Sequence, residues 1–387
     1  MTVKSKSKLP VSRFDMIVIT VVIIMVVVIS FVLLVGTEPE AGLRIAYLRT
    51  DDNYFTNIWL YDLATGDHER LTDEDDAVFD YSVSPDGDLI AFTQRNPETE
   101  ITEIMLLDLE TRRRTQVTNC ADEDSACTSP AWRPGGQMLA YQRISLNTGL
   151  GIPVSPNRIG LLDLSTNPSQ TFPLIPDPQV LGYGPEWSGD GQKLAFYDSA
   201  TGGILIYNFE ANDNNSIPQL TFLPTTYGNV GKFSPDGTRM LFPELLAGGA
   251  FVHSTLQVAN LETLQVNNLT NADDNSDDPT GNWSPDGTRI AFIRRYLDEG
   301  RRTIGHQIYM LNVADESTAP LIVDGRYNHS VPIWSPDGTQ LLVQRFPQLT
   351  DTGDYNQAGT LEIWTYTLDT GELVRITENA YNPQWVP

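Results

Sequence analysis

Residues 283–292, Trp-Ser-Pro-Asp-Gly-Thr-Arg-Ile-Ala-Phe, hold the pattern that decides the fold: an aromatic residue, a tight turn and a short apolar strand. The pattern returns roughly every 50 residues along the chain. The other copies of the turn stand at residues 84–87, 234–237 and 335–338, with degraded copies at 133–136 and 188–191. A repeat of this length predicts a modular architecture.

The chemistry of the repeated turn explains its residues. Proline presets φ at the second position, aspartate tolerates the third, and glycine takes the positive φ of the fourth. Such a turn reverses the chain between two adjacent antiparallel strands. A carboxylate repeated in nearly every unit is more simply explained by this geometry than by catalysis. We therefore predict a structural role for Asp86, Asp236, Asp286 and Asp337.

Each repeat contains four candidate strands. An aromatic segment precedes the turn and the apolar strand follows it. A third strand comes after a variable loop, as at residues 103–109, and a short fourth strand closes the unit, as at 375–377. All are rich in β-branched and aromatic residues and are separated by turn chemistry. Because a four-stranded unit cannot bury both of its faces alone, radial stacking into a β-propeller is expected.

The ends of the repeat region complement each other. Seven apolar second strands can be counted, but only six turns precede them. Residues 382–387 match the stretch that leads to Trp334-Ser335-Pro336 and then stop, whereas residues 43–72 lack that part. We predict that the C-terminus supplies the innermost strand of blade one, which closes the ring and removes its exposed edges. The fold class is therefore all-β, a seven-bladed propeller of four-stranded blades over residues 43–387.

With these motifs in hand, the chain resembles the TolB-type, WD-like β-propeller repeat family over residues 43–387. Similar propellers serve as periplasmic interaction platforms, as gating domains of prolyl-oligopeptidase-type hydrolases, and as lyases. The resemblance implies the fold rather than one of these functions. There is no room for the N-terminal α/β domain of TolB, so a Pal-lipoprotein partner is not implied.

The N-terminal region predicts a membrane anchor. Residues 16–35 carry no charge, and as a helix they would span about 30 Å, the thickness of a bilayer's hydrocarbon core. Basic residues precede this run and acidic residues follow it, which places the N-terminus in the cytoplasm. The expected division is a basic cytoplasmic tail (1–15), a signal-anchor helix (16–35), a linker (36–42) and an extracytoplasmic propeller. The alternative is a cleaved signal peptide, whose apolar region is normally shorter.

Composition excludes some functions. The formal net charge is −25, with 50 acidic and 25 basic residues. Nucleic-acid binding is excluded because it depends on clustered lysine and arginine. No Gly-x-Ser-x-Gly, phosphate-binding loop or dinucleotide fingerprint occurs in the sequence, so neither a hydrolase nor a cofactor is predicted. The acidic excess favours a basic partner, and a salty habitat is an equally good explanation of it.

Cys120 and Cys127 are the two cysteines, seven positions apart. In an exported domain such a local pair predicts a disulfide that pins a loop, with a reduced pair as the alternative.

Three histidines are weak candidates for a metal site. His253, His306 and His329 fall in connections that should open on the same face of the propeller. Converging histidines could hold a metal ion, as in similar propeller lyases that degrade uronate-rich polysaccharides. The simpler interpretation is scattered loop histidines.

Acidic residues gather in the loops that join one blade to the next. These loops should share one rim, opposite the Ser-Pro-Asp-Gly turns. The rim could dock a basic partner, weakly hold a divalent cation, or be merely a solvated surface. Its candidate residues are Asp73, Glu74, Asp75, Asp76, Asp122, Glu123, Asp124, Asp273, Asp274, Asp277 and Asp278.

Taken together, the sequence predicts a single-pass protein of the cytoplasmic membrane that presents a non-enzymatic binding platform. Its partner would be a protein or a cell-envelope carbohydrate. One alternative is a metal-assisted polysaccharide lyase or hydrolase that uses the histidine-bearing face. The other is a structural subunit of a membrane complex.

Overall fold

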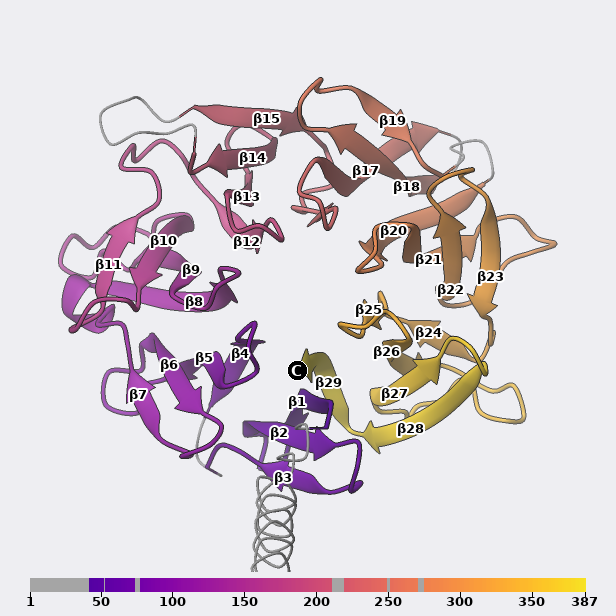
Figure 1. The fold of residues 1–387 in the computed structure, drawn as a ribbon, viewed down its shortest axis with the longest axis horizontal. Helices are drawn as coiled ribbons and strands as arrows, with labels where there is room; N and C mark the ends of the chain where they lie inside the picture. The colour runs from indigo at the N-terminus through magenta and orange to yellow at the C-terminus, as the bar shows by residue number, and fades with distance from the viewer. Residues whose placement is uncertain (1–41, 52, 74–76, 211–218, 249–250, 271–274) are drawn as a thin grey trace, which may run out of the picture. The chain divides into compact units, whose positions relative to one another are not determined.

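The computed structural model describes residues 42–51, 53–73, 77–210, 219–248, 251–270 and 275–387. They form seven antiparallel β-sheets arranged as blades around a central axis (Figure 1). The prediction of an all-β, seven-bladed propeller is confirmed. Residues 1–41, which include the predicted anchor, lie outside the described residues. Among the described residues there is no helix with the length and apolar character needed to cross a bilayer.

The strands follow one another from the inside of each blade to the outside. Blade 1 contains β29 (Ala380–Val386), β1 (Arg44–Thr50), β2 (Thr56–Asp62) and β3 (His68–Arg70). Blade 2 contains β4 (Val78–Val83), β5 (Leu89–Arg95), β6 (Thr102–Asp108) and β7 (Arg114–Gln116). Blade 3 contains β8 (Ser125–Trp132), β9 (Met138–Ser145), β10 (Arg158–Asp163) and β11 (Gln170–Pro173). A 3-10 helix, η1 (Ala121–Glu123), precedes β8.

The remaining blades repeat this order, except that the innermost position of blade 7 is shared by two short strands. Blade 4 contains β12 (Tyr183–Trp187), β13 (Lys193–Asp198), β14 (Gly203–Asn208) and β15 (Leu220–Pro224). Blade 5 contains β16 (Lys232–Phe233), β17 (Arg239–Gly248), β18 (Phe251–Asn260) and β19 (Val266–Asn268). Blade 6 contains β20 (Ser276–Trp283), β21 (Arg289–Tyr296), β22 (Gln307–Asn312) and β23 (Thr318–Ile322). Blade 7 contains β24 (Tyr327–His329), β25 (Ile333–Trp334), β26 (Gln340–Pro347), β27 (Glu362–Thr367) and β28 (Glu372–Glu378).

The hydrophobic core is divided among the boundaries between blades. Each second strand is covered on both faces by neighbouring blades, so it is apolar without alternation. In β5, for example, Ile90, Ala91 and Phe92 are all fully buried. Ile90 and Phe92 pack in the cluster shared with blade 1, whereas Ala91 packs in the cluster shared with blade 3. Consecutive residues of one strand therefore serve two different boundaries.

The repeated turn is held by its own side chains. In blade 6 the Ser284 hydroxyl donates to Asp286 Oδ1 at 2.5 Å and accepts from the backbone N–H of Arg289 at 2.9 Å. Asp286 also accepts hydrogen bonds from the backbone N–H and the hydroxyl of Thr288. The hydrogen bond from Ser284, followed by those from Thr288, lowers the pKa of Asp286 to about 2. Gly287 takes a φ of 69°, where a side chain would be strained. The carboxylate thus has a structural part in the turn.

Tryptophan joins successive blades. At five blade boundaries its indole Nε1–H donates to a backbone carbonyl on the inner strand of the preceding blade. The pairs are Trp132 to Ser82 (3.0 Å), Trp187 to Ala131 (3.1 Å), Trp283 to Lys232 (3.3 Å), Trp334 to Asn282 (3.1 Å) and Trp385 to Ile333 (3.2 Å). Phe233 occupies the equivalent position in blade 5 and Val83 in blade 2. The tryptophan is therefore a fixed contact of the ring at these five boundaries.

The two ends of the propeller meet in blade 1, as predicted. Strand β29 pairs antiparallel with β1, with Val386 opposite Arg44, and the two lie side by side in Figure 1. At the boundary with blade 2, where tryptophan is missing, the Gln384 amide replaces it. Its Oε1 accepts from the Val83 backbone N–H at 3.0 Å, and its Nε2 donates to the Tyr81 carbonyl at 2.8 Å.

Removal of residues 381–387 should open the ring, because β1 would lose its inner neighbour and the buried Trp385 and Val386 would be deleted. We expect a lower urea midpoint and a larger hydrodynamic radius, measured by fluorescence and gel filtration. Removal of Pro387 alone, which lies after β29, is the control. A truncated protein that unfolds at the parent's midpoint would contradict the closure.

Substitution Trp283→Phe should keep most of the apolar contact but leave the Lys232 carbonyl without its donor. The expected loss is about 1 kcal/mol in the free energy of unfolding. Trp59→Phe is the matched control, because Trp59 lies in β2 and is not one of the five boundary donors. Equal effects of the two substitutions in urea denaturation would show that the boundary hydrogen bond contributes nothing measurable.

Candidate functional site

The ring presents two faces with different connections. Antiparallel pairing brings the turns between first and second strands, and those between third and fourth strands, to the same end of each blade. We call this end the turn face; it includes residues 284–287. The opposite end, the loop face, carries the connections between second and third strands, such as residues 146–157, and the connections between blades. The candidate histidines, the described candidate carboxylates and both cysteines belong to the loop face.

Several candidate carboxylates on the loop face are compensated locally. Asp73 is ion-paired with Arg114, and Glu123 is paired with Arg143 at 2.6 Å. Asp124 accepts hydrogen bonds from the backbone N–H and the hydroxyl of Thr148, whereas Asp122 is exposed. A basic partner would therefore have to compete with arginines that are already bound. The other candidates in this group, Glu74, Asp75, Asp76, Asp273 and Asp274, lie outside the described residues.

Asp278 is buried, which corrects the expectation of an exposed rim at this residue. Its side chain is 1% exposed and faces Arg294, which is 3% exposed. The guanidinium binds it through two hydrogen bonds, Nε to Oδ1 at 2.8 Å and Nη2 to Oδ2 at 2.7 Å. A buried pair of this geometry is an internal structural element, since neither charge can be left uncompensated in a low-dielectric interior.

The neighbouring Asp277 connects blade 6 to blade 5. It accepts hydrogen bonds from the backbone N–H and the hydroxyl of Ser254, at 3.0 and 2.7 Å, and lies 3.1 Å from His306 Nε2. Burial by itself would raise the pKa of Asp277, but the hydrogen bonds from His306 and Ser254 outweigh it and hold the pKa well below its usual range. Asp277 is thus a charged hydrogen-bond acceptor within the ring.

The three histidines take part in different local contacts. His329 is 1% exposed, and its Nδ1 lies 3.0 Å from the His306 carbonyl oxygen, to which Nδ1–H can donate. Burial lowers the pKa of His329 to about 4, so the ring is neutral at pH 7. His253 Nε2 is buried and has no hydrogen-bond partner among the described residues. No group of three His, Cys, Asp or Glu side chains in the described part of the chain is placed to hold a metal ion.

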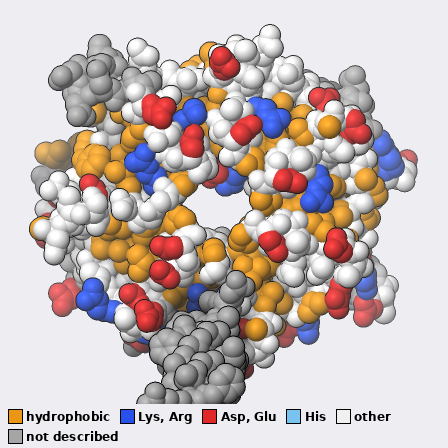
Figure 2. Space-filling view, in the orientation of Figure 1, with side chains coloured by type: hydrophobic (Ala, Val, Ile, Leu, Met, Phe, Trp, Pro, Cys, Tyr) orange, Lys and Arg blue, Asp and Glu red, His pale blue; other side chains and the backbone are white. Residues whose placement is uncertain are grey.

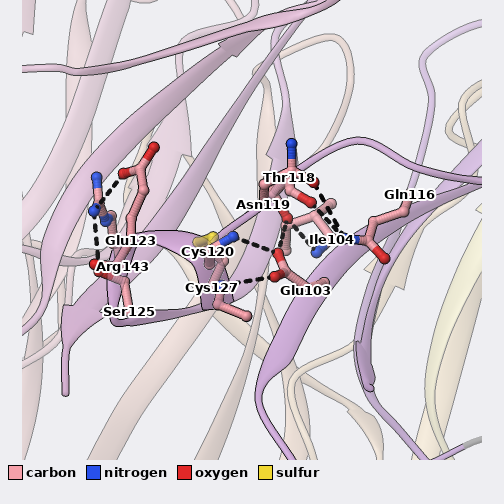
Figure 3. Close-up of a disulfide and its surroundings, with 11 residues drawn as sticks. Glu103, Ile104, Gln116, Thr118, Asn119, Cys120, Glu123, Ser125, Cys127 and Arg143 are labelled. Atoms are coloured by element: carbon pink, nitrogen blue, oxygen red, sulfur yellow. Dashed lines mark hydrogen bonds and ion pairs between the residues drawn. A yellow bond between two sulfur atoms is a disulfide. The ribbon is translucent and has the colours of Figure 1, made fainter. Parts of the chain in front are cut away.

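A disulfide joins Cys120, in the connection from blade 2 to blade 3, to Cys127 in β8 (Figure 3). Beside it the carboxylate of Glu103, which is 2% exposed, accepts from the backbone N–H groups of Cys120 and Ala121, both at 2.9 Å. It also accepts from the Thr118 hydroxyl at 2.6 Å. The disulfide and this buried carboxylate hold the same turn of chain, which carries Glu123 toward Arg143.

Exposed apolar side chains gather on the loop face. Sixteen large hydrophobic residues are exposed among the described residues. Four of them lie on outermost strands, and one, Leu264, lies on the turn face. Eleven lie in or beside loop-face connections: Tyr54, Phe55, Phe79, Leu150, Ile152, Val154, Leu245, Val252, Ile304, Val323 and Tyr355. Such clustering on one side of a protein is typical of an interaction surface.

The most apolar of these connections is residues 149–154, Gly-Leu-Gly-Ile-Pro-Val, where Leu150 is 72% exposed. The sequence analysis missed it. In the sequence this segment is recognisable as an apolar run, rich in glycine and proline, in the variable loop between two predicted strands. Strand periodicity does not detect such a run, because exposure depends on what the fold places over it.

The centre of the ring is open, as Figure 2 shows. A cavity of about 630 Å³ opens along the inner strands of blades 4 to 7 and blade 1. Its wall includes Trp283, Trp334, Asn282, Gln384 and Lys232. Trp283 and Trp334 already bind neighbouring blades, so this wall belongs largely to the scaffold.

No family model matches the chain. It is 31% identical over 114 residues to an uncharacterized peptidase, YuxL, of Bacillus subtilis, covering 29% of this chain and 16% of that protein. It is 24% identical over 204 residues to the uncharacterized protein Atu1656 of Agrobacterium fabrum, covering 52% of this chain and 60% of that protein. The chain thus spans less than two thirds of either relative.

Solved propellers share the architecture at low sequence identity. The propeller domain of the Trilobed protease of Pyrococcus furiosus, described as having an open velcro topology, matches with a TM-score of 0.56 and 16% identity, over 87% of this chain and 94% of that one. Oligogalacturonate lyase in complex with manganese matches with a TM-score of 0.55 and 17% identity, over 81% and 83%. TolB of Acinetobacter baumannii matches with a TM-score of 0.48 and 16% identity, over 89% and 66%.

Of these neighbours, the two with TM-scores above 0.5 come from proteins named as enzymes, but at 16–17% identity they show the fold alone and leave enzyme status open. Their likeness is one of fold: the chain is a seven-bladed β-propeller with TolB-like proteins among its structural neighbours.

Substitution Asp278→Asn should remove the buried negative charge that binds the Arg294 guanidinium through two hydrogen bonds. We expect a loss of about 3–5 kcal/mol in the free energy of unfolding, measured by urea denaturation at pH 7. Asp122→Asn, at an exposed carboxylate of the same face, should change stability by less than about 0.5 kcal/mol. A variant at Asp278 as stable as the Asp122 control would show that the pair is not a structural element.

Proposed function

We propose that the protein is a membrane-tethered, non-enzymatic binding platform that docks a partner protein on its loop face. One observation carries this proposal: of the sixteen large hydrophobic residues exposed in the described part of the chain, eleven lie in or beside loop-face connections and one lies on the turn face. Burying apolar surface is the main favourable term of protein association. A carbohydrate would instead call for exposed polar groups around an aromatic platform.

Charge on the two faces supports the same choice. On the loop face several carboxylates are paired, including Glu123 with Arg143 and Asp298 with Arg301 at 2.6 Å. The exposed aspartates of the repeated turns, such as Asp236 and Asp337, bond to turn hydroxyl and N–H groups. Because charged residues are depleted at the cores of interfaces, a face with compensated charge and exposed apolar groups is the better docking surface.

The tether is the part of the proposal that rests on sequence. Residues 16–35 supply an uncharged run of spanning length, and the basic residues before it orient the propeller outward. Among the described residues no grouping of histidines favours the lyase alternative over the platform. If the protein were instead a fixed subunit of a membrane complex, it would use the same docking surface. The two alternatives differ only in the lifetime of the complex.

The test places a photo-crosslinking amino acid at position 152 or 355 of the full-length protein in its native membrane, and at 264 on the turn face as the control. Loop-face probes should give a discrete protein adduct, and the turn-face probe should not. The double substitution Leu150→Asp and Val154→Asp should abolish the adduct from position 152, since two carboxylates would have to be desolvated. Equal adducts from both faces, or adducts unaffected by the double substitution, would refute the docking surface.

A further inference from the structure

A separate cavity of about 190 Å³ lies in blade 3, on strands β9, β10 and β11. It is lined by Tyr141, Arg143, Ser145, Arg158, Phe172 and Pro173, among others. Gly160 allows the Tyr141 ring to take its place in this lining, because a Cβ atom at residue 160 would come within 2.5 Å of that ring. The cavity is distinct from the central opening and from the exposed apolar residues of the 149–154 loop.

Two arginines line this cavity from neighbouring strands. Arg143 on β9 and Arg158 on β10 are directly opposite in the antiparallel register, so their side chains leave the sheet on the same side. Like charges in this position are unfavourable unless an anion lies between or beside them. The pairing is notable in a chain with twice as many acidic as basic residues, 50 against 25.

The protein compensates only part of this charge. Arg143 Nη2 lies 2.6 Å from Glu123 and donates to the Ser125 hydroxyl at 2.9 Å (Figure 3). Arg158 Nη2 donates to the carbonyl of Pro178 at 2.8 Å, which positions the guanidinium without neutralising it. Arg158 Nε is buried and has no hydrogen-bond partner among the described residues. Glu123 therefore compensates Arg143, whereas Arg158 has no carboxylate partner among the described residues and keeps a buried donor without an acceptor.

We propose that this cavity binds a small organic carboxylate, whose anionic group accepts from Arg158 and whose body rests against Phe172 and Pro173. Guanidinium groups suit carboxylates because their planar donors match the two oxygens. A buried N–H that lacks an acceptor is unfavourable, and a bound anion would supply the acceptor. Burial raises the pKa of Tyr141 to about 12, so its hydroxyl stays protonated as a further donor. The volume suits a compact acid rather than a polymer.

The site is independent of the proposed docking function. It needs neither a membrane tether nor a partner protein, and no residue of the 149–154 loop lines it. Binding can therefore be measured on the purified full-length protein in mild detergent, and its outcome does not depend on whether the loop face docks a protein.

The test is calorimetric titration with benzoate and glucuronate as carboxylates. Benzamide is the neutral counterpart of benzoate, and inorganic phosphate is the anion without an organic body. We expect saturable binding of at least one carboxylate and none of benzamide. Arg158→Gln should weaken it by about tenfold or more, the equivalent of one charge-assisted hydrogen bond. Arg95→Gln, at a loop-face arginine of blade 2, should bind as the parent does.

Glu123→Gln provides a change of opposite sign. Removing the internal carboxylate frees Arg143, so carboxylate affinity should rise severalfold, a result that a misfolded variant cannot produce. Three outcomes would overturn the proposal: no saturable heat with either carboxylate, unchanged affinity in Arg158→Gln, or phosphate binding in preference to both carboxylates.

Discussion

Each blade of this propeller is covered only by its neighbours, and the indole N–H of a tryptophan is the contact that recurs between them. Five inner strands receive that hydrogen bond on a backbone carbonyl. Because buried polar groups must be paired, the donor and the carbonyl fix how one blade sits on the next. Blade 2 has Val83 in place of the tryptophan. At that boundary the Gln384 amide of β29 bonds the inner strand of blade 2, β4. Ring closure by β29 depends on the same rule, since Trp385 bonds Ile333 of blade 7.

This constraint separates the faces of the molecule. The turn face has a structural role, because the serine and aspartate of the repeated turn form defined hydrogen bonds and its glycine takes a positive φ. The loop face has no repeated turn of this kind, so its connections differ in length and composition from blade to blade. Apolar groups exposed there do not contribute to the ring, which makes an interaction surface the simplest explanation of their position.

Within the loop face, acidic residues have acquired several internal roles. Asp278 forms an ion pair with a buried arginine, Asp277 connects two blades, and Glu123 forms an ion pair with Arg143. The disulfide between Cys120 and Cys127 supports only the last of these roles, because the turn that it closes in blade 3 also carries Glu123 to Arg143. Blade 3 thus combines an exposed apolar loop with a cationic cavity, two features that pure scaffolding does not require.

The sequence by itself determined the repeat, the number of blades and the closure, because turn geometry and strand periodicity are local and recur in every unit. It also placed the histidines and the candidate carboxylates on one rim, since antiparallel connectivity fixes which loops share an end. Only the tertiary structure decided what each of them does there. Whether Asp278 is a surface charge or a buried counter-ion depends on Arg294 lying beside it. The Arg143–Arg158 cavity likewise depends on strand register and on the missing side chain of Gly160. Whether a side chain is buried, ion-paired or beside a cavity depends on contacts between strands. The repeat pattern does not say which residues the variable positions contact.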